Sequence, residues 1–507
     1  MSLVDGLRTS VSRRLALKAG GAALLATTAE WTLMDKLAWL PTRTALAAGP
    51  PSDIQHDIGA FIAPAFSRNG VQVQFGPVFT GFITARLTRT PTTNDQAIFN
   101  NALATIEQFY PWSPSGIFTF VSYSVDYFNR LGGFGAGTRP NRFIPRLRSN
   151  TARFVLERSV AGPTDVVRNA NGTIFNNRAM RRFIVPLTLE NNEVLITMRS
   201  DSTDIINDVF GWLQGDNTLN GRFVASPSNR SIFSFTSARL MFQQIGLTRQ
   251  VAESNNLPFA GRIQPDSPMW MGFADQQTNS SGPAAITTFL GNNSARVTNA
   301  TAGSYFDNGS IQHLSHVLQD LEQFYDNTGT ISGEPEVFTE RVQYMFRSNP
   351  IPSQGNADQF TDGGGPSFLN NAFQGTGDAA VSASGQNDDG GTHRFGHEQA
   401  LQRSSRAADG TPIHDRMDGA GFNSMDVPAG RGFGAGNNLP KLQFTVFVPS
   451  ADFFRVMRIN QASLDLETQF AVEEADSGLE RFITATRRQN FLSPPRRHRA
   501  FPLVEVT

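Results

Sequence analysis

The sequence predicts an α+β fold built from two related halves. Segments with the alternation of β-strands and segments with helical spacing follow one another along the chain. The string Glu-Gln-Phe-Tyr at 107–110 recurs at 322–325, and each copy ends a helix-like segment. Gene duplication is one explanation of this repeat and chance identity is the other. At 507 residues the chain is long enough for two ordinary domains.

The first half contains three expected strands and two expected helices. Helical spacing between 94 and 110 places Ile98, Ala102 and Ile106 on one face. The other expected elements of this half are strands at 81–87, 116–123 and 194–198 and a helix at 202–213. In the second half we expect strands at 309–314 and 442–448 and a helix from Ser450. Helices between strands of this kind are typical of an α+β sandwich.

The first 47 residues resemble a twin-arginine export signal. The segment from Ser12 to Lys18 contains Arg13 and Arg14, and a small-residue apolar run follows at 19–28. Ala45-Leu-Ala47 supplies a cleavage pattern, although Ala16 stands where a large apolar residue is usual. We therefore expect an exported protein, periplasmic, cell-surface or extracellular, whose signal is either cleaved or retained as an anchor. This pathway moves folded proteins, which favours a buried cofactor.

Composition excludes several classes of function. The chain has no cysteine, so disulfides, iron–sulfur clusters and thiolate-ligated haem are excluded. Without the signal the net charge is about −4, which gives no electrostatic basis for binding nucleic acid. No apolar run after the signal reaches the ~20 residues of a membrane-spanning helix. Lys441 is the only lysine beyond the signal, so Schiff-base chemistry is not expected.

Residues 349–392 form a low-complexity insert rich in Gly, Asn, Asp and Ser. Its acidic strings at Asp362 and at Asp388-Asp389 could bind calcium, but they lack the spacing of an EF-hand. A mobile surface loop is the favoured interpretation.

Three chemical residues follow one another in the second half. Asp275 ends the string Gly-Phe-Ala-Asp, His397 follows Gly396, and Arg416 comes nineteen residues after His397. The strand-like string LQFTVFVPSADFF at 442–454 comes next. These pieces in this order resemble the C-terminal half of dye-decolourising (DyP-type) haem peroxidases. Strings at 110–118, 124–130 and 490–499 are similar to those of a little-studied group of twin-arginine-exported proteins, which looks like an offshoot of that superfamily.

The resemblance implies a fold, a cofactor and a reaction. The fold would be a dimeric α+β barrel of two ferredoxin-like halves, at 48–265 and 266–507, with antiparallel sheets covered by helices. The cofactor would be haem b, with His397 as the axial ligand of its iron. Asp275 would carry protons and Arg416 would stabilise charge while hydrogen peroxide is reduced and a small organic substrate is oxidised. Trp270 or Tyr305 would be surface residues that pass electrons, and open sheet edges would be compatible with a homo-oligomer.

Departures from the family pattern keep a second hypothesis open. Gln276 replaces the final glycine of the motif, and Glu398 follows His397 where an Ile-Arg string is usual. The distal arginine could also be Arg403 or Arg406, although spacing favours Arg416. The alternative is therefore a haem-free exported scaffold or binding protein that retains the fold.

Each candidate also has a structural interpretation. Asp275 could cap a turn, and Arg416 could form a surface ion pair with Asp415 or Asp418. His397 could be a hydrogen-bonded loop residue. His393 with His397 would be a metal pair, but Gly396 between them disfavours a helix. His313, on an expected strand, is predicted to be structural. The basic segment 494–499 could meet an acidic partner or haem propionates, and its apolar flanks predict packing on the body of the protein.

Overall fold

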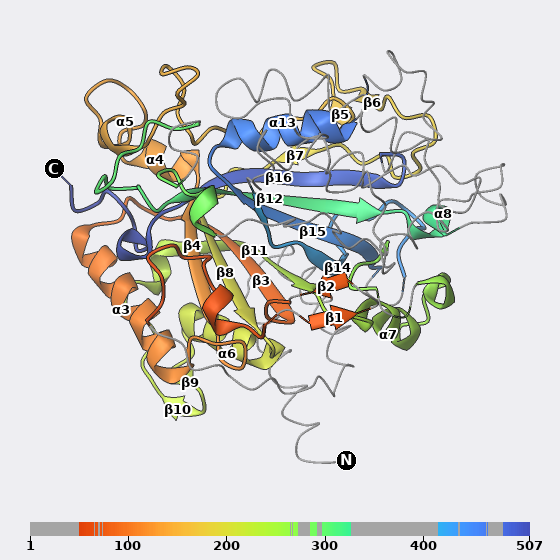
Figure 1. The fold of residues 1–507 in the computed structure, drawn as a ribbon, viewed down its shortest axis with the longest axis horizontal. Coiled ribbons are helices and arrows are strands. Elements are labelled where there is room, and N and C mark those ends of the chain that lie inside the picture. The colour runs from red at the N-terminus through yellow and green to blue at the C-terminus, as the bar shows by residue number, and fades with distance from the viewer. Residues whose placement is uncertain are drawn as a thin grey trace.

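The structure is a computed structural model of the 507-residue chain. It describes residues 50–506 except for several segments: 65, 69–70, 74, 264, 266, 272–283, 292–296, 326–413, 434–436, 463 and 465–479. Two similar units make up most of the described chain (Figure 1).

The first unit has the order strand, helix, two strands, helix, strand. Its elements are β3 (Phe79–Leu87), α3 (Thr93–Phe109), β4 (Phe118–Tyr123), β8 (Val194–Ser200), α6 (Thr203–Gln214) and β11 (Phe233–Phe242). The strands lie in the order β11-β3-β8-β4, all antiparallel. Numbered within the unit this order is 4-1-3-2, which is the ferredoxin-like arrangement.

The second unit repeats this order. Its elements are β12 (Ser310–Gln319), α8 (Leu321–Phe324), β13 (Asp415–Arg416), β14 (Gly419–Asn423), β15 (Leu439–Val448), α13 (Ala451–Ala462) and β16 (Ile483–Ser493). The strands lie in the order β16-β12-β15-β14, again 4-1-3-2, and β13 extends β14 along β15. The predicted α+β class with two ferredoxin-like halves is therefore confirmed. The domain boundary near 265 stays a prediction.

The two sheets join edge to edge into a closed barrel of eight strands. One seam pairs β11 with β14 at Phe242 and Ala420, and the other pairs β16 with β4 at Leu492 and Tyr123. Each seam is short, so the barrel consists of two well-paired sheets held together at narrow contacts. The helices lie outside: Figure 1 shows α13 over β16 and α3 and α6 on the other half.

Local sequence explains where the first helix begins and which face it buries. Thr92 accepts a hydrogen bond from the Asp95 backbone, and Asp95 accepts one from the Thr92 backbone, so a capping box starts α3. Phe99, Leu103 and Ile106 on one side of α3 are buried against the sheet.

Shorter elements complete the fold. They are η1 (Gly59–Phe61), β1 (Phe66–Arg68), β2 (Val71–Val73), α4 (Val125–Arg130), α5 (Arg139–Phe143), β5 (Val167–Arg168), β6 (Ile174–Phe175), β7 (Thr188–Leu189), β9 (Thr218–Leu219), β10 (Arg222–Phe223), η2 (Arg230–Ile232), α7 (Leu247–Ser254), η3 (Ala260–Arg262), η4 (Ala284–Thr287) and η8 (Arg496–His498). Among the described helices, none is both long and apolar enough to cross a membrane.

The N-terminal segment closes one seam of the barrel. The Gln55 side chain donates hydrogen bonds to the carbonyls of Val121 on β4 (2.9 Å) and Pro494 after β16 (2.8 Å). It also accepts one from the Val121 amide at 2.9 Å. Ile58 and Phe61 then pack among the apolar side chains inside the barrel. The Gln55 side chain therefore makes the hydrogen bonds that the backbones of β4 and β16 do not make with each other at this point.

The C-terminal basic segment packs on the body, as its apolar flanks predicted. Arg496 and Arg499 both pair with Glu107 at 2.5 Å. Arg497 pairs with Asp307 at 2.5 Å and also with Asp53.

Candidate functional site

Two of the three predicted site residues, Asp275 and His397, lie outside the described residues, as do Gln276 and the 349–392 insert. The third, Arg416, is half-buried on β13, where its cross-strand partner is Val446 of β15. The positions predicted for proton transfer and iron ligation therefore stay predictions, and the surroundings of Arg416 can be described.

Arg416 lies on the outer face of the second sheet, the side away from the barrel interior. The cross-strand row on this face runs from Arg416 through Val446 on β15 and His313 on β12 to Asn490 on β16. Cross-strand partners share a face, so Arg416 and His313 project from the same side two strands apart. Leu442 and Phe444 alternate onto this side as well. These two side chains are only half-buried, although the inward-facing neighbours between and beyond them are fully buried.

His313 has a structural role in this row. Its two ring nitrogens lie 2.6 Å from Asn490 Oδ1 and 2.6 Å from Ser315 Oγ. Its ring stacks on Phe454 of α13 with centroids 3.3 Å apart. Burial, and then the nearby Arg488 charge, hold the pKa of His313 well below its usual value, so the ring is neutral. Both ring nitrogens are hydrogen-bonded to neighbouring side chains, which agrees with the predicted structural role of His313.

A buried ionic network lies beside His313 under α13. Asp165 accepts from Arg488 Nη1 at 2.5 Å and from Arg458 Nη2 at 3.2 Å, and its side chain is 1% exposed. Arg458 also donates to Glu480 at 2.8 Å. Although desolvation opposes it, the two arginines hold the pKa of Asp165 below its ordinary value. The network links α13 and β16 to the segment that contains Asp165. Its charged side chains therefore have a structural role.

Trp270 fixes the chain five residues before Asp275. Its indole Nε1 donates to the Gly421 carbonyl of β14 at 3.0 Å, and its ring packs edge-on against Phe242 and Phe422. The side chain is fully buried, so the expectation of a surface tryptophan is wrong. β13 and β14 are successive parts of one strand path along β15, so Trp270 is hydrogen-bonded to the same strand path that carries Arg416.

Tyr305, the second proposed electron carrier, is partly buried. Its hydroxyl donates to Glu505 at 2.6 Å and accepts from the Leu503 amide at 2.9 Å. Desolvation, with the carboxylate as a further cause, raises its pKa, so it holds its proton and serves as a hydrogen-bonding residue of the C-terminal segment.

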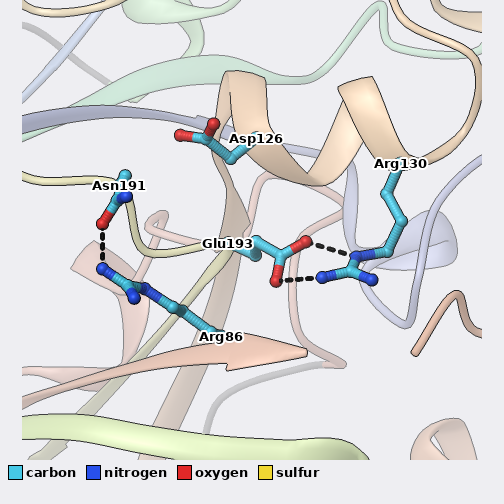
Figure 2. A pocket seen from close by; sticks show the side chains of 5 residues that line it. All are labelled: Arg86, Asp126, Arg130, Asn191 and Glu193. Atoms are coloured by element: carbon cyan, nitrogen blue, oxygen red, sulfur yellow. Dashed lines mark hydrogen bonds and ion pairs between the residues drawn. The ribbon is translucent and has the colours of Figure 1, made fainter. Parts of the chain in front are cut away.

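The first half has an open polar pocket of about 390 Å³ (Figure 2). Its lining residues come from the end of β3, from α4 and from the loop before β8: Arg86, Asp126, Arg130, Asn191 and Glu193. Arg130 forms a two-point ion pair with Glu193, at 2.5 and 2.8 Å, and Arg86 donates to Asn191. No sequence pattern indicated this pocket, because its residues are far apart in the chain. Its charges are largely satisfied by one another, which indicates a structural site.

Among the described residues, no group of three or more His, Cys, Asp or Glu side chains could hold a metal ion. The single axial histidine expected for haem, His397, lies outside these residues.

Comparisons with known proteins give a family and a set of similar structures. A model described as a family of unknown function (DUF7405) matches residues 167–495. No curated protein matches. A putative DyP-type peroxidase from Shewanella oneidensis is 13% identical over 83% of this chain and 94% of its own, with a TM-score of 0.42. A DyP-type peroxidase from Cellulomonas bogoriensis is 10% identical over 86% and 95%, with a TM-score of 0.46. A DypB variant from Rhodococcus jostii in complex with heme is 10% identical over 83% and 94%, with a TM-score of 0.42.

Proposed function

The chain belongs to the family of unknown function DUF7405, and we propose that it is an exported, haem-dependent peroxidase of the DyP type. It would reduce hydrogen peroxide and oxidise a small organic substrate. The observation that carries the proposal is the position of Arg416 on the outer face of the second sheet, the face onto which the half-buried Leu442 and Phe444 also project.

The described part of this face fits a flat apolar group with acidic substituents. The side chains of Leu442 and Phe444 offer apolar contact, and Arg416 offers a guanidinium cation. His313 on the same face is already engaged, so the ligand to iron has to come from elsewhere.

Topology supports His397 as that ligand. In the first half, the connection between the first and second strands contains α3, which covers the outer face of its sheet. His397 lies in the equivalent connection of the second half, between β12 and β13. Because the two halves share one topology, we expect this connection to bring His397 to the outer face near Arg416.

The anchoring of Trp270 supports Asp275 as the partner of Arg416. Trp270 is bonded to Gly421, five residues after Arg416 on the same strand path, and Asp275 follows Trp270 by five residues. Five extended residues span at most about 17 Å, so Asp275 is within reach of Arg416.

Each residue then has one task. Haem, when bound, supplies the redox chemistry with peroxide. His397 would hold the iron through a neutral ring nitrogen, and a hydrogen bond to its other nitrogen would strengthen that donation. Asp275 would take a proton from the peroxide and return it to the oxygen that departs. Arg416 would stabilise the negative charge that develops on that oxygen. The export signal at 1–47 would place the reaction outside the cytoplasm.

An absorption spectrum tests the proposal. Protein expressed with haem supplied should show a Soret band that is lost or shifted in His397→Ala and unchanged in His498→Gln, which alters a histidine stacked on Tyr305. Arg416→Leu should keep the band and lose most peroxide turnover. A folded parent protein without a Soret band would overturn the peroxidase and leave the haem-free scaffold.

A further inference from the structure

The barrel interior contains a group of buried cations that is independent of the outer face. Four residues on four strands form it, and we call them the cation cluster: Arg239 (β11), His316 (β12), Lys441 (β15) and Arg487 (β16). Arg239, His316 and Lys441 are fully buried. Arg239 is the cross-strand partner of Phe82, which packs among the apolar side chains inside the barrel, so the cluster faces inward.

Strand register brings the four side chains together. His316 is the cross-strand partner of Arg487 on one side and of Gln443 on the other. Arg239 and Arg487 both donate to the same Glu190 oxygen, the latter at 3.5 Å, so their guanidinium groups are neighbours.

Gly421 lets the lysine join them. A Cβ at position 421 would lie 3.0 Å from Lys441 Cε and 2.6 Å from the Leu240 carbonyl. The Lys441 side chain therefore passes over Gly421 toward β11, the strand that carries Arg239. A side chain at 421 would block that path.

The carboxylate nearest to Arg239 is shared between two arginines. Glu190 pairs with both Arg239 and Arg487 through one oxygen, and Asp426 pairs with Arg487 at 2.8 Å. His316 is neutral, because burial and then the charges of Lys441, Arg239 and Arg487 lower its pKa. The field at the His316 ring is therefore positive.

Unsatisfied hydrogen-bonding atoms mark where a ligand would sit. Among the residues that the structure describes, Arg239 Nε and Nη1 and both ring nitrogens of His316 are buried and have no hydrogen-bond partner. A buried guanidinium nitrogen without a partner is costly, and water or an ion usually explains such atoms in proteins. The positive field at this place favours an anion over water alone.

We propose that the barrel interior binds one small monovalent inorganic anion, such as chloride, held by Arg239 and His316 in the positive field of Lys441 and Arg487. A neutral imidazole can donate one N–H to the anion while Arg239 donates two. The anion would accept hydrogen bonds from Arg239 Nε, Arg239 Nη1 and one ring nitrogen of His316, and would stabilise the neighbouring positive charges.

Thermal unfolding tests this site. The full-length protein is titrated with sodium chloride against sodium gluconate at constant ionic strength, so that a small halide is compared with an anion too large for the site. We expect a saturable rise in Tm of at least about 2 °C in chloride, and a similar rise in bromide. Arg239→Gln should abolish the rise, and Arg86→Gln, which removes an exposed arginine of the adjacent strand β3, should leave it intact.

A second measurement tests anion binding on the folded parent protein, in case the Arg239→Gln variant does not fold. Line broadening of the ³⁵Cl NMR signal by the parent protein should be displaced by bromide and reduced in His316→Gln or Lys441→Met. Equal Tm in chloride and gluconate, or a chloride effect lost equally in Arg86→Gln, would overturn the proposal and leave water inside the barrel.

Discussion

Replacing Asp165 by asparagine should destabilise the protein far more than breaking a surface ion pair. The carboxylate is 1% exposed and is bonded to Arg488 at 2.5 Å and to Arg458 at 3.2 Å. Arg458 keeps Glu480 at 2.8 Å, whereas Arg488 has its direct ion pair with Asp165. Asp165→Asn would therefore leave a buried guanidinium with an uncompensated charge. Losing one partner of a buried pair costs about 3–5 kcal/mol, and we expect about 3 kcal/mol here, because asparagine retains one acceptor.

Urea unfolding at pH 7 provides the assay, with Asp126→Asn as the matched control. Asp126 also pairs with an arginine, Arg158, at 2.5 Å, but the arginine side chain is 54% exposed and the aspartate 23%. Exposed pairs contribute about 0–1 kcal/mol, so the control should unfold near the parent midpoint. The reasoning would be refuted by a loss below about 1 kcal/mol for Asp165→Asn with an unchanged m value, or by equal losses in the two variants.

Two further variants test other parts of the structure. Burial lowers the pKa of His56 to about 3, so the folded protein binds fewer protons than the unfolded chain between pH 3 and 6.5, and stability falls as pH drops through this window. His56→Phe should keep the stacking on Phe447. It should lower the slope of the free energy of unfolding against pH by about 1.4 kcal/mol per pH unit between pH 6 and 4, as measured by urea unfolding. Identical slopes in the parent and the variant would contradict this account. Gly421→Ala should cost about 1–3 kcal/mol, because its Cβ would lie 2.6 Å from the Leu240 carbonyl, whereas Gly59→Ala, with no atom within 4 Å, should be neutral in the same thermal unfolding assay.

Elements with one apolar face were predictable from the sequence. The expected helix at 94–110 is α3 at Thr93–Phe109, and the expected strand at 442–448 is the second part of β15. The order of these elements was sufficient for the α+β class, because helices recur between strands.

The last strand of the second half was missed for a physical reason. β16 contains Arg487-Arg488-Gln489-Asn490, four polar residues in succession, and most of this strand is buried on both sides. One side lies in the barrel and the other under α13, and both contain ionic networks. A sequence rule that expects charged residues to face solvent cannot identify such a strand. For the same reason Arg239 and His316 gave no local signal: their contacts come from strands far apart in the sequence.

The candidate site was only partly predictable. Spacing identified Arg416, which lies on the outer face of the second sheet. Its cross-strand partner Val446 comes from another segment of the chain, and only the strand pairing brings the two residues together.

The seam clamped by Gln55 sets the order in which the protein can be completed. The hydrogen bond between Gln55 and Pro494 joins residues 439 positions apart. A ribosome releasing the chain from its N-terminus would let the first half pair its own strands early, but the barrel could not be sealed until almost the entire polypeptide had emerged. A chain that stopped before β16 would leave β4 with an open edge, the kind of surface on which other chains assemble. Closure of this seam therefore requires both Gln55, near the start of the described chain, and Pro494, near its end.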